Sequence, residues 1–239
     1  MGKLIVANWK MNKVRVEAEA FFAELDGLVD NHSKNAYAVC PPATILHYVS
    51  EVAPKKMKVG AQNVYYKESG AFTGEISVKM AKDAGASFSL VGHSERRNIF
   101  GETNDDVKEK ITALQNDGLD VMLCGGEHLE EHDNLKAVLQ EQLSVLKDVD
   151  IGKVIVAYEP VWAIGTGKVA ELQDIVCAHK IIKDYVKNMF GRDVKVLYGG
   201  SVKASNAGEI LSLDEVDGVL VGGASLDPKQ FAHMIYTEC

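Results

Sequence analysis

Short apolar runs and longer amphipathic segments alternate along the whole chain. The apolar runs are rich in β-branched residues and lack the polar alternation of a half-exposed strand, so each predicts a strand buried on both faces. The predicted strands begin near Lys3, Ala36, Met57, Ser87, Leu119, Lys153, Asp193 and Val216. Helical periodicity fills the intervals, most clearly over residues 16–28, 104–117, 135–146 and 172–189. Strands that alternate with helices indicate an α/β fold with a parallel sheet.

The number and spacing of these units favour a closed barrel. Eight strand–helix units in 239 residues match a (β/α)8 barrel, whose usual size is about 250 residues. The alternative is an open doubly wound sheet, which usually carries a glycine-rich turn after its first strand. Residues 8–12 follow the first predicted strand and contain no glycine. We therefore expect a single (β/α)8 barrel domain over residues 1–239.

The composition is that of an ordinary globular protein with an acidic balance. Apolar residues make up 46% of the chain, and the formal net charge of −8 argues against binding to nucleic acid or to an anionic membrane. The strand-like run at Lys3 leaves no room for a signal peptide, and no apolar stretch approaches the roughly 20 residues of a membrane span. The four dispersed cysteines are typical of reduced thiols. We therefore expect a cytoplasmic protein.

Unusual polar residues follow the predicted strands at their carboxyl ends, where (β/α)8 barrels build their active sites. Asn8 and Lys10 follow the first strand, and His93 and Glu95 follow the fourth. Glu159 follows the sixth. Gly-Gly turns follow the seventh and eighth strands, at residues 199–200 and 222–223. Paired glycines let backbone N–H groups approach an anion closely, so these two turns predict a phosphate site.

Glu159 and His93 suit proton transfer beside a carbonyl group. Glu159 ends an apolar strand and opens into an apolar segment, residues 160–169, which begins with proline and carries two glycines. This pattern predicts a base under a mobile lid that excludes water. His93 begins a short helical turn, where the helix dipole would keep the imidazole neutral, and a neutral imidazole opposite a carboxylate base is the pair that enolisation needs. A solvated Glu159 in an ordinary turn and a structural His93 are the alternatives.

Seven motifs, in order along the chain, resemble those of the triosephosphate isomerase family. They include Gly-His-Ser-Glu-Arg-Arg at residues 92–97 and Tyr-Glu-Pro-Val-Trp-Ala-Ile-Gly-Thr-Gly-Lys at 158–168, and the others lie at 7–12, 60–63, 70–75, 198–202 and 222–226. The resemblance implies a TIM barrel that interconverts dihydroxyacetone phosphate and D-glyceraldehyde 3-phosphate in glycolysis and gluconeogenesis. It also implies proton transfer through an enediol(ate), with no metal or organic cofactor.

The same resemblance implies roles for individual residues. Glu159 would move a proton between adjacent carbons, and His93 would polarise the carbonyl group and move protons between the oxygens. Lys10 and Asn8 would bind the substrate and stabilise its developing negative charge. Glu95 would orient Lys10. Backbone N–H groups would bind the phosphate at Gly165, Ser201, Gly222 and Gly223.

The segment 63–75, which begins at Asn63 and ends at Glu75, predicts a homodimer. It is long for a strand-to-helix connection and carries several apolar and aromatic residues, and an exposed apolar loop usually has a partner. The resemblance implies that this loop inserts into a second copy of the chain, with Thr73 near the neighbour's Asn8 and His93. The alternative is a loop folded over its own barrel.

Two other functions fit parts of the sequence. Residues 128–132 match the H-x-x-E-H pattern of metalloenzymes, with His128 and His132 at i and i+4 on one helical face. A barrel that binds a ligand without catalysis is the second.

The chain departs from the family pattern at Lys13, at Val169 and at residues 125–126, where an aliphatic residue is missing. These departures bear on lid kinetics and local stability and leave the chemical groups of the reaction in place.

Overall fold

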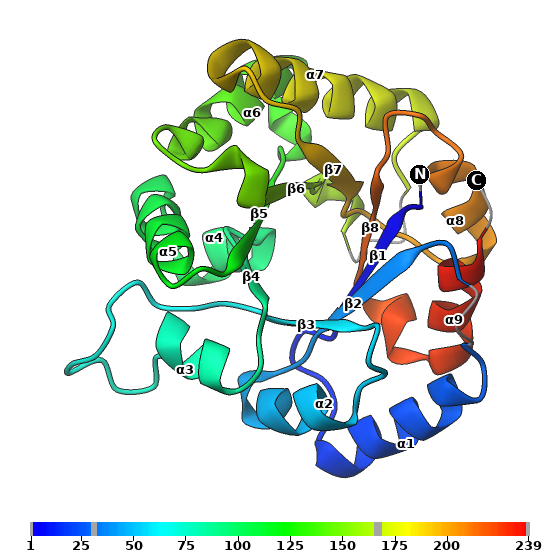
Figure 1. Ribbon diagram of the computed structural model, residues 1–239. Coiled ribbons are helices and arrows are strands. Elements are labelled where there is room, and N and C mark those ends of the chain that lie inside the picture. Colours follow the sequence, from blue (N-terminus) through cyan, green and yellow to red (C-terminus); the bar gives the residue numbers. More distant parts are fainter. Residues whose placement is uncertain (1, 30–32, 165–168, 238–239) are drawn as a thin grey trace.

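Eight parallel strands close into a barrel (Figure 1). The computed structural model describes residues 2–29, 33–164 and 169–237. Neighbouring strands pair in sequence order, and the last pairs with the first, with Leu4 opposite Gly218. The strands are β1 (Leu4–Asn8), β2 (Ala36–Cys40), β3 (Lys58–Ala61), β4 (Phe88–Val91), β5 (Asp120–Gly125), β6 (Val154–Tyr158), β7 (Lys195–Tyr198) and β8 (Gly218–Val221). The predicted (β/α)8 fold is confirmed, and each strand begins within two residues of its predicted start.

Helices surround the barrel as an outer ring (Figure 1). The α-helices of the described ranges are α1 (Arg15–Asp26), α2 (Leu46–Val52), α3 (Val78–Asp83), α4 (Ser94–Phe100), α5 (Asn104–Asn116), α6 (Leu135–Leu143), α7 (Leu172–Phe190), α8 (Ala204–Leu211) and α9 (Pro228–Tyr236). Short 3-10 helices are η1 (Ala43–Ile45), η2 (Leu129–Asn134), η3 (Ser144–Leu146), η4 (Ile151–Lys153), η5 (Val161–Ala163) and η6 (Gly223–Leu226). The helix predicted over 135–146 is divided into α6 and η3, because its last turn tightens to 3-10 geometry. Within the described ranges, none of the helices is long and apolar enough to cross a lipid bilayer.

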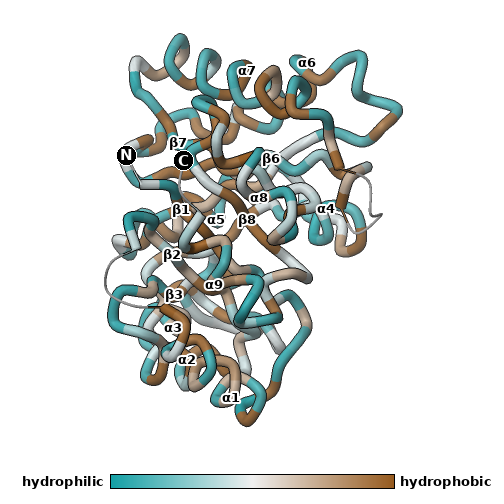
Figure 2. Tube along the Cα trace, turned by 90° about the vertical axis from the view of Figure 1, so that its right-hand side faces the viewer, coloured by the Kyte–Doolittle hydropathy of each residue, from teal (hydrophilic) through white to brown (hydrophobic). Residues whose placement is uncertain are grey.

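Two apolar layers stabilise the barrel. One fills its interior and includes Val6 and Leu90, and the other lies between the strands and the helices and includes Ile5 and Ala7. Successive side chains of a strand point to opposite faces, so β1 contributes to both layers. Trp9, just after β1, extends the outer layer. In Figure 2 the hydrophobic segments gather on the strands and alternate with hydrophilic ones along the helices.

A buried histidine of α7 packs against the barrel wall. The imidazole of His179 lies edge-on to Tyr158 of β6, with ring centroids 5.9 Å apart, and its Nδ1 is 3.1 Å from the carbonyl oxygen of Glu215. Its Nε2 finds no hydrogen-bond partner among the described residues. Burial lowers the pKa of His179 from 6.5 to about 4, so the ring is neutral in the folded protein.

His179 therefore predicts a loss of stability as the pH falls from 7 to 5. In this range the folded chain keeps the ring neutral, whereas the unfolded chain takes up a proton below the ordinary pKa of 6.5. Because the unfolded state then binds more protons, this residue should lower the free energy of unfolding by about 2 kcal/mol between these pH values. Urea unfolding of a His179→Gln variant should lack this part of the pH dependence, and the control His47→Gln, at an exposed histidine of α2, should retain it. Equal pH dependence in wild type and His179→Gln would contradict the interpretation.

Candidate active site

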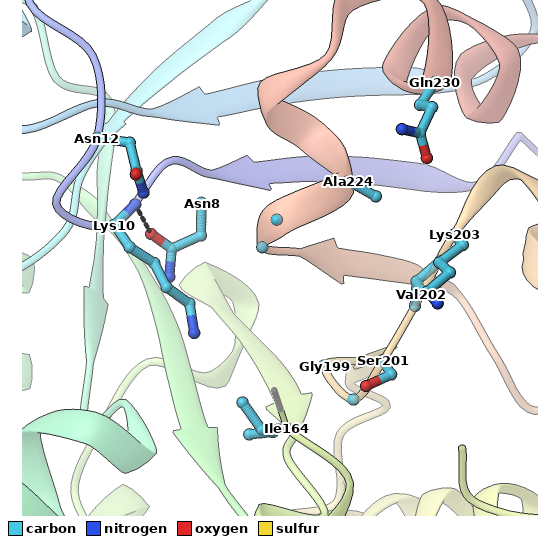
Figure 3. Close-up of a pocket in the computed structure, with 13 residues that line it drawn as sticks. Asn8, Lys10, Asn12, Ile164, Gly199, Ser201, Val202, Lys203, Ala224 and Gln230 are labelled. Atoms are coloured by element: carbon cyan, nitrogen blue, oxygen red, sulfur yellow. Dashed lines mark hydrogen bonds between the residues drawn. The ribbon is translucent and has the colours of Figure 1, made fainter. Parts of the chain in front are cut away.

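A pocket of about 580 Å³ opens at the carboxyl ends of the strands (Figure 3). Its size is in the range of small-molecule binding sites. Asn8 and Lys10 line one part of the pocket, and Ser201, after β7, lies apart from them (Figure 3). Gly222 and Gly223, after β8, also line the pocket, and Gly222 is beside Lys10, because an added Cβ would lie 3.2 Å from the Lys10 Cε. The structure thus brings five of the predicted site residues to one pocket, although they come from opposite ends of the chain.

The backbone at Lys10 makes a left-handed turn beside the pocket. Its φ is 51°, which is uncommon for a residue other than glycine. The Oδ1 atom of Asn8 accepts a hydrogen bond from the Lys10 N–H at 3.0 Å, and the side-chain amide of Gln62 donates to the Lys10 carbonyl oxygen at 2.8 Å. These two bonds hold the turn in place and offset its strain. The Lys10 ammonium group ends 2.5 Å from Oε1 of Glu95, so the two side chains that the resemblance pairs form an ion pair. The motif analysis had given Gln62 no role.

His93 is the N-cap of α4, in agreement with the predicted helical start. Its Nδ1 accepts a hydrogen bond from the backbone N–H of Glu95 at 3.2 Å. An acceptor nitrogen carries no proton, so the proton of the neutral ring lies on Nε2. That Nε2 atom is 3.0 Å from Oε1 of Glu159. The N-cap bond therefore fixes the tautomer of His93, with the proton on the nitrogen that lies beside the candidate base.

Glu159 carries a buried carboxylate at the end of β6. The residue is 1% exposed, and its Oε2 accepts a hydrogen bond from the backbone N–H of Ser94 at 2.8 Å. Its Oε1 lies close to His93, but the two groups are out of line for a hydrogen bond, and this oxygen has no other partner among the described residues. Burying a carboxylate oxygen that accepts no hydrogen bond lowers the stability of the fold. A role in the reaction would explain why this oxygen is left without a partner. Neither Glu159 nor His93 is in the lining of the pocket; Glu159 lies directly behind Gly199, which does line it and whose added Cβ would lie 3.0 Å from the Glu159 Cγ. Glu159 itself lines a separate cavity of about 210 Å³, together with Ser94.

Together these contacts form a continuous polar chain from Lys10 through Glu95 and His93 to Glu159. The chain joins the carboxyl ends of β1, β4 and β6. Inside the barrel, burial raises the pKa of the Cys124 thiol well above its ordinary value, and the negative charge of Glu159 raises it further. The thiol therefore stays protonated and adds no charge to the site. The arrangement brings one carboxylate, one imidazole and one ammonium group into a single series of contacts, of which Lys10 lines the pocket.

The loop after β6 begins with η5, which side chains hold on both sides. The indole of Trp162 donates from Nε1 to Oε1 of the buried Glu127 at 2.8 Å. The hydroxyl of Ser201 donates to the carbonyl oxygen of Ala163 at 2.5 Å. Residues 165–168, including the predicted phosphate ligand Gly165, lie outside the described residues. The described part of the predicted lid is thus bonded to Ser201 in the wall of the pocket.

The departure at residues 125–126 has a structural explanation. A Cβ added at Gly126 would lie 1.8 Å from the carbonyl oxygen of Glu159, so a larger residue would push the ends of β5 and β6 apart. At Gly125 the space for a side chain is taken by Gln142 of α6, whose Oε1 would lie 2.5 Å from the added Cβ. The Gln142 amide also accepts from the Gly126 N–H at 2.8 Å and donates to its carbonyl oxygen at 3.0 Å. Gln142 therefore occupies the space beside Gly125 and fixes the backbone next to Glu159.

The metalloenzyme alternative needs His128 and His132 on one face of an α-helix, and this part of it is wrong. Residues 128–132 form the N-cap and first turn of η2, a 3-10 helix, in which residues four apart do not share a face. His128 lies 3.1 Å from Asn98, whereas His132 lies 3.2 Å from Glu127. The two rings thus contact different partners. In the described part of the chain, no three His, Cys, Asp or Glu side chains are grouped so that they could hold a metal ion.

The loop 63–75 between β3 and α3 extends outward from the barrel (Figure 1). Tyr65 packs against Tyr66 and Phe72, with ring centroids 4.4 and 4.8 Å apart, so the loop has an aromatic cluster of its own. At its base, Lys110 of α5 donates to Oδ1 of Asn63 at 2.8 Å. The loop is therefore held by an aromatic cluster of its own and, at its base, by a hydrogen bond to α5.

The fold and this pocket together define a (β/α)8 barrel protein with a polar small-molecule site at the carboxyl ends of its strands. Comparison with known proteins narrows the class. Residues 3–238 match the family model described as "Triosephosphate isomerase". A protein of that name from Nitratidesulfovibrio vulgaris (strain DP4) is 47% identical, over 98% of this chain and 99% of the relative. A protein of the same name from Lawsonia intracellularis is 43% identical, over 99% of this chain and 98% of the relative. Another, from Coprinopsis cinerea, is 44% identical, over 93% of this chain and 92% of the relative. The chain belongs to the triosephosphate isomerase family, and the resemblance recognised from its motifs is confirmed.

Proposed function

We infer that this chain is an isomerase that interconverts dihydroxyacetone phosphate and D-glyceraldehyde 3-phosphate, a reaction of glycolysis and gluconeogenesis. Family membership supports the reaction, and the contact between Glu159 and His93 beside the pocket is the observation that carries the assignment of roles. The reaction moves one proton between adjacent carbons and one between adjacent oxygens. It therefore needs a base, a neutral donor and a stabiliser of negative charge.

Glu159 acts as the base in this proposal. Its carboxylate removes a proton from the carbon next to the carbonyl group, and the electron pair of the broken C–H bond forms the carbon–carbon double bond of an enediolate. The same carboxylate then returns the proton to the neighbouring carbon. Burial of Glu159 supports this role, because a carboxylate without a water shell needs little reorganisation before it accepts a proton.

His93, Lys10 and Asn8 act on the substrate oxygens. The Nε2–H of His93 donates a hydrogen bond to the carbonyl oxygen and transfers the proton between the two oxygens. A neutral histidine in this role is established for triosephosphate isomerases. The Lys10 ammonium group and the Asn8 amide stabilise the negative charge of the enediolate, and Glu95 holds Lys10 at 2.5 Å.

The phosphate group binds to the loops that follow β7 and β8 in the lining of the pocket. Ser201 follows β7, and Gly222 and Gly223 lie where β8 leads into η6, so backbone N–H groups of these loops are available to an anion. A Cβ at Gly222 would lie 3.2 Å from Cε of Lys10, so the missing side chain leaves room for that lysine. Gly165 is proposed from its motif as a further ligand, with residues 160–169 as a lid over the intermediate.

We further propose that the active form is a homodimer. Met11 is 96% exposed and directly follows Lys10, and Phe100 is 68% exposed at the end of the helix that His93 begins. Apolar side chains exposed on the same elements as the catalytic residues favour a protein partner at this edge of the pocket. The loop 63–75 of a second copy, with its aromatic cluster and Thr73, has the chemistry to cover them.

A cytoplasmic location and one domain over residues 1–239 complete the proposal. Cys40, Cys124 and Cys177 are free thiols, which supports a reducing compartment. The first and last strands pair with each other, so the barrel needs both ends of the chain. A small phosphorylated triose is the proposed substrate, and neither nucleic acid nor a membrane is a proposed partner.

Shortening the proposed base tests its role. Glu159→Asp withdraws the carboxylate by one methylene, on the order of 1 Å, and misplacement of that size costs roughly 10²-fold in rate. In a coupled assay of triose phosphate interconversion, kcat should fall by about that factor while KM changes much less. Glu141→Asp, at an exposed position of α6, is the matched control and should retain full activity. Normal turnover by Glu159→Asp would mean that the base is misassigned, and no turnover by the wild-type chain would favour a barrel that only binds.

A charge at the tip of the loop tests the dimer. Thr73→Arg should place an unpaired charge in the proposed contact, at a cost of ~3–5 kcal/mol, and yield monomers of weak activity. Thr112→Arg, at an exposed position of α5, makes the same chemical change away from the loop and should leave the dimer intact. Sedimentation and activity are measured on the same samples. Wild-type protein that sediments as a fully active monomer at assay concentration would refute the dimer.

A further inference from the structure

A second cavity lies at the opposite mouth of the barrel, where the strands begin. Its volume is about 220 Å³, and its lining includes Leu4, Lys58, Asp120, Ile155 and Lys195. These residues stand at or next to the first positions of β1, β3, β5, β6 and β7. The active-site pocket, by contrast, is lined by residues at and beyond the carboxyl ends of the strands. The two cavities share no residue.

The walls of this cavity are apolar because side chains of the barrel interior face it at the end where the strands begin. Val6, Phe88 and Met122 belong to the packed interior and also line the cavity. Leu4 and Ile155 pack against that interior but stay partly exposed. Apolar side chains that face a hollow in place of a packed neighbour lose contacts and burial. A bound apolar group would restore both.

The rim of the cavity is positively charged. Lys3, Lys56, Lys58 and Lys195 line it, and Asp120 is the single acidic residue among the described residues of the lining. The ammonium group of Lys58 lies 3.7 Å from Asp120, and that of Lys3 donates to the carbonyl oxygens of Leu213 and Val216. An excess of lysine at this mouth contrasts with the net charge of −8 of the whole chain. Such a rim attracts anions.

Lys195 places a positive charge next to the apolar wall of the cavity. In β7, Lys195 is two residues before Leu197, which belongs to the barrel interior, so both side chains share the inward face. Its Cα is paired with that of Ile155 on β6. An inward-facing ammonium group therefore stands beside an inward-facing, partly exposed isoleucine. One ligand could contact both only if it had an anionic end and an apolar end.

We propose that this cavity is a second binding site, for a small amphipathic anion with a carboxylate or phosphate head and an apolar body of about one ring or a short alkyl chain. A cavity of about 150 Å³ lined by apolar side chains accommodates benzene, so the larger volume here suits a body of this size. The head would meet Lys195 and Lys58 at the rim, and the body would contact Leu4 and Ile155. The site does not depend on the isomerase reaction or on the proposed dimer.

Calorimetric titration of the full chain with octanoate, and with octanol as its uncharged analogue, tests the proposal. Octanoate should bind at one site per chain, and octanol at least tenfold more weakly. Lys195→Gln should weaken octanoate binding about three- to fivefold, the effect of losing one partly exposed ion pair. Lys147→Gln, which removes an exposed lysine outside the cavity, should not change it. Isomerase activity should be equal in both variants.

A space-filling variant locates the binding. Ala36 lines the cavity at an exposed position on the same face of β2 as the interior Ala38, so Ala36→Leu would fill the hollow without disturbing the packed core. This variant should abolish octanoate binding at unchanged activity and thermal stability. Absence of octanoate binding to wild type at millimolar concentration would overturn the proposal. Equal affinity for octanol, or unchanged octanoate binding by Lys195→Gln or Ala36→Leu, would do so as well.

Discussion

Closure of the barrel between β1 and β8 is the constraint on which the rest of the structure depends. Eight parallel strands in sequence order place every carboxyl end at one mouth, so residues far apart in the chain share one pocket. The same closure places every strand beginning at the other mouth, where the apolar interior ends and lysines form the rim. The core between them is packed from both faces of each strand, which makes the barrel a rigid support for both ends.

His93 and Glu159, at one end of the polar chain, are buried at a cost in free energy, and the fold compensates for that cost in specific ways. A buried carboxylate loses its water, and the backbone N–H of Ser94 replaces part of that solvation for Glu159. The ammonium group of Lys10 is matched by Glu95. What stays unmatched is Oε1 of Glu159, the atom that the proposed reaction uses. Catalytic groups that are left undersatisfied in the free enzyme lower stability and can interact more strongly with the reacting substrate.

The sequence predicted the strands well because a buried parallel strand appears as a continuous apolar run. It predicted a pocket at the carboxyl ends of the strands because (β/α)8 barrels build their sites there. It could not predict contacts that depend on the folded chain. The H-x-x-E-H match had the right spacing, but residues 128–132 take 3-10 geometry, with His128 and His132 held by separate partners. Gln142 lies in none of the motifs, and the motif at 60–63 assigned no contact to Gln62, because each side chain acts on backbone that is distant in sequence. The left-handed turn at Lys10 likewise depends in part on the distant side chain of Gln62.

The central claim is that the hydrogen bond from the Glu95 backbone N–H fixes His93 as a neutral ring with its proton on Nε2, the nitrogen that lies 3.0 Å from Glu159. Nitrogen-15 chemical shifts of the His93 ring at neutral pH test it most directly, because they distinguish the two neutral tautomers and the charged form. The account predicts a protonated Nε2 and a bare, hydrogen-bonded Nδ1. A proton on Nδ1, alone or together with Nε2, would contradict it.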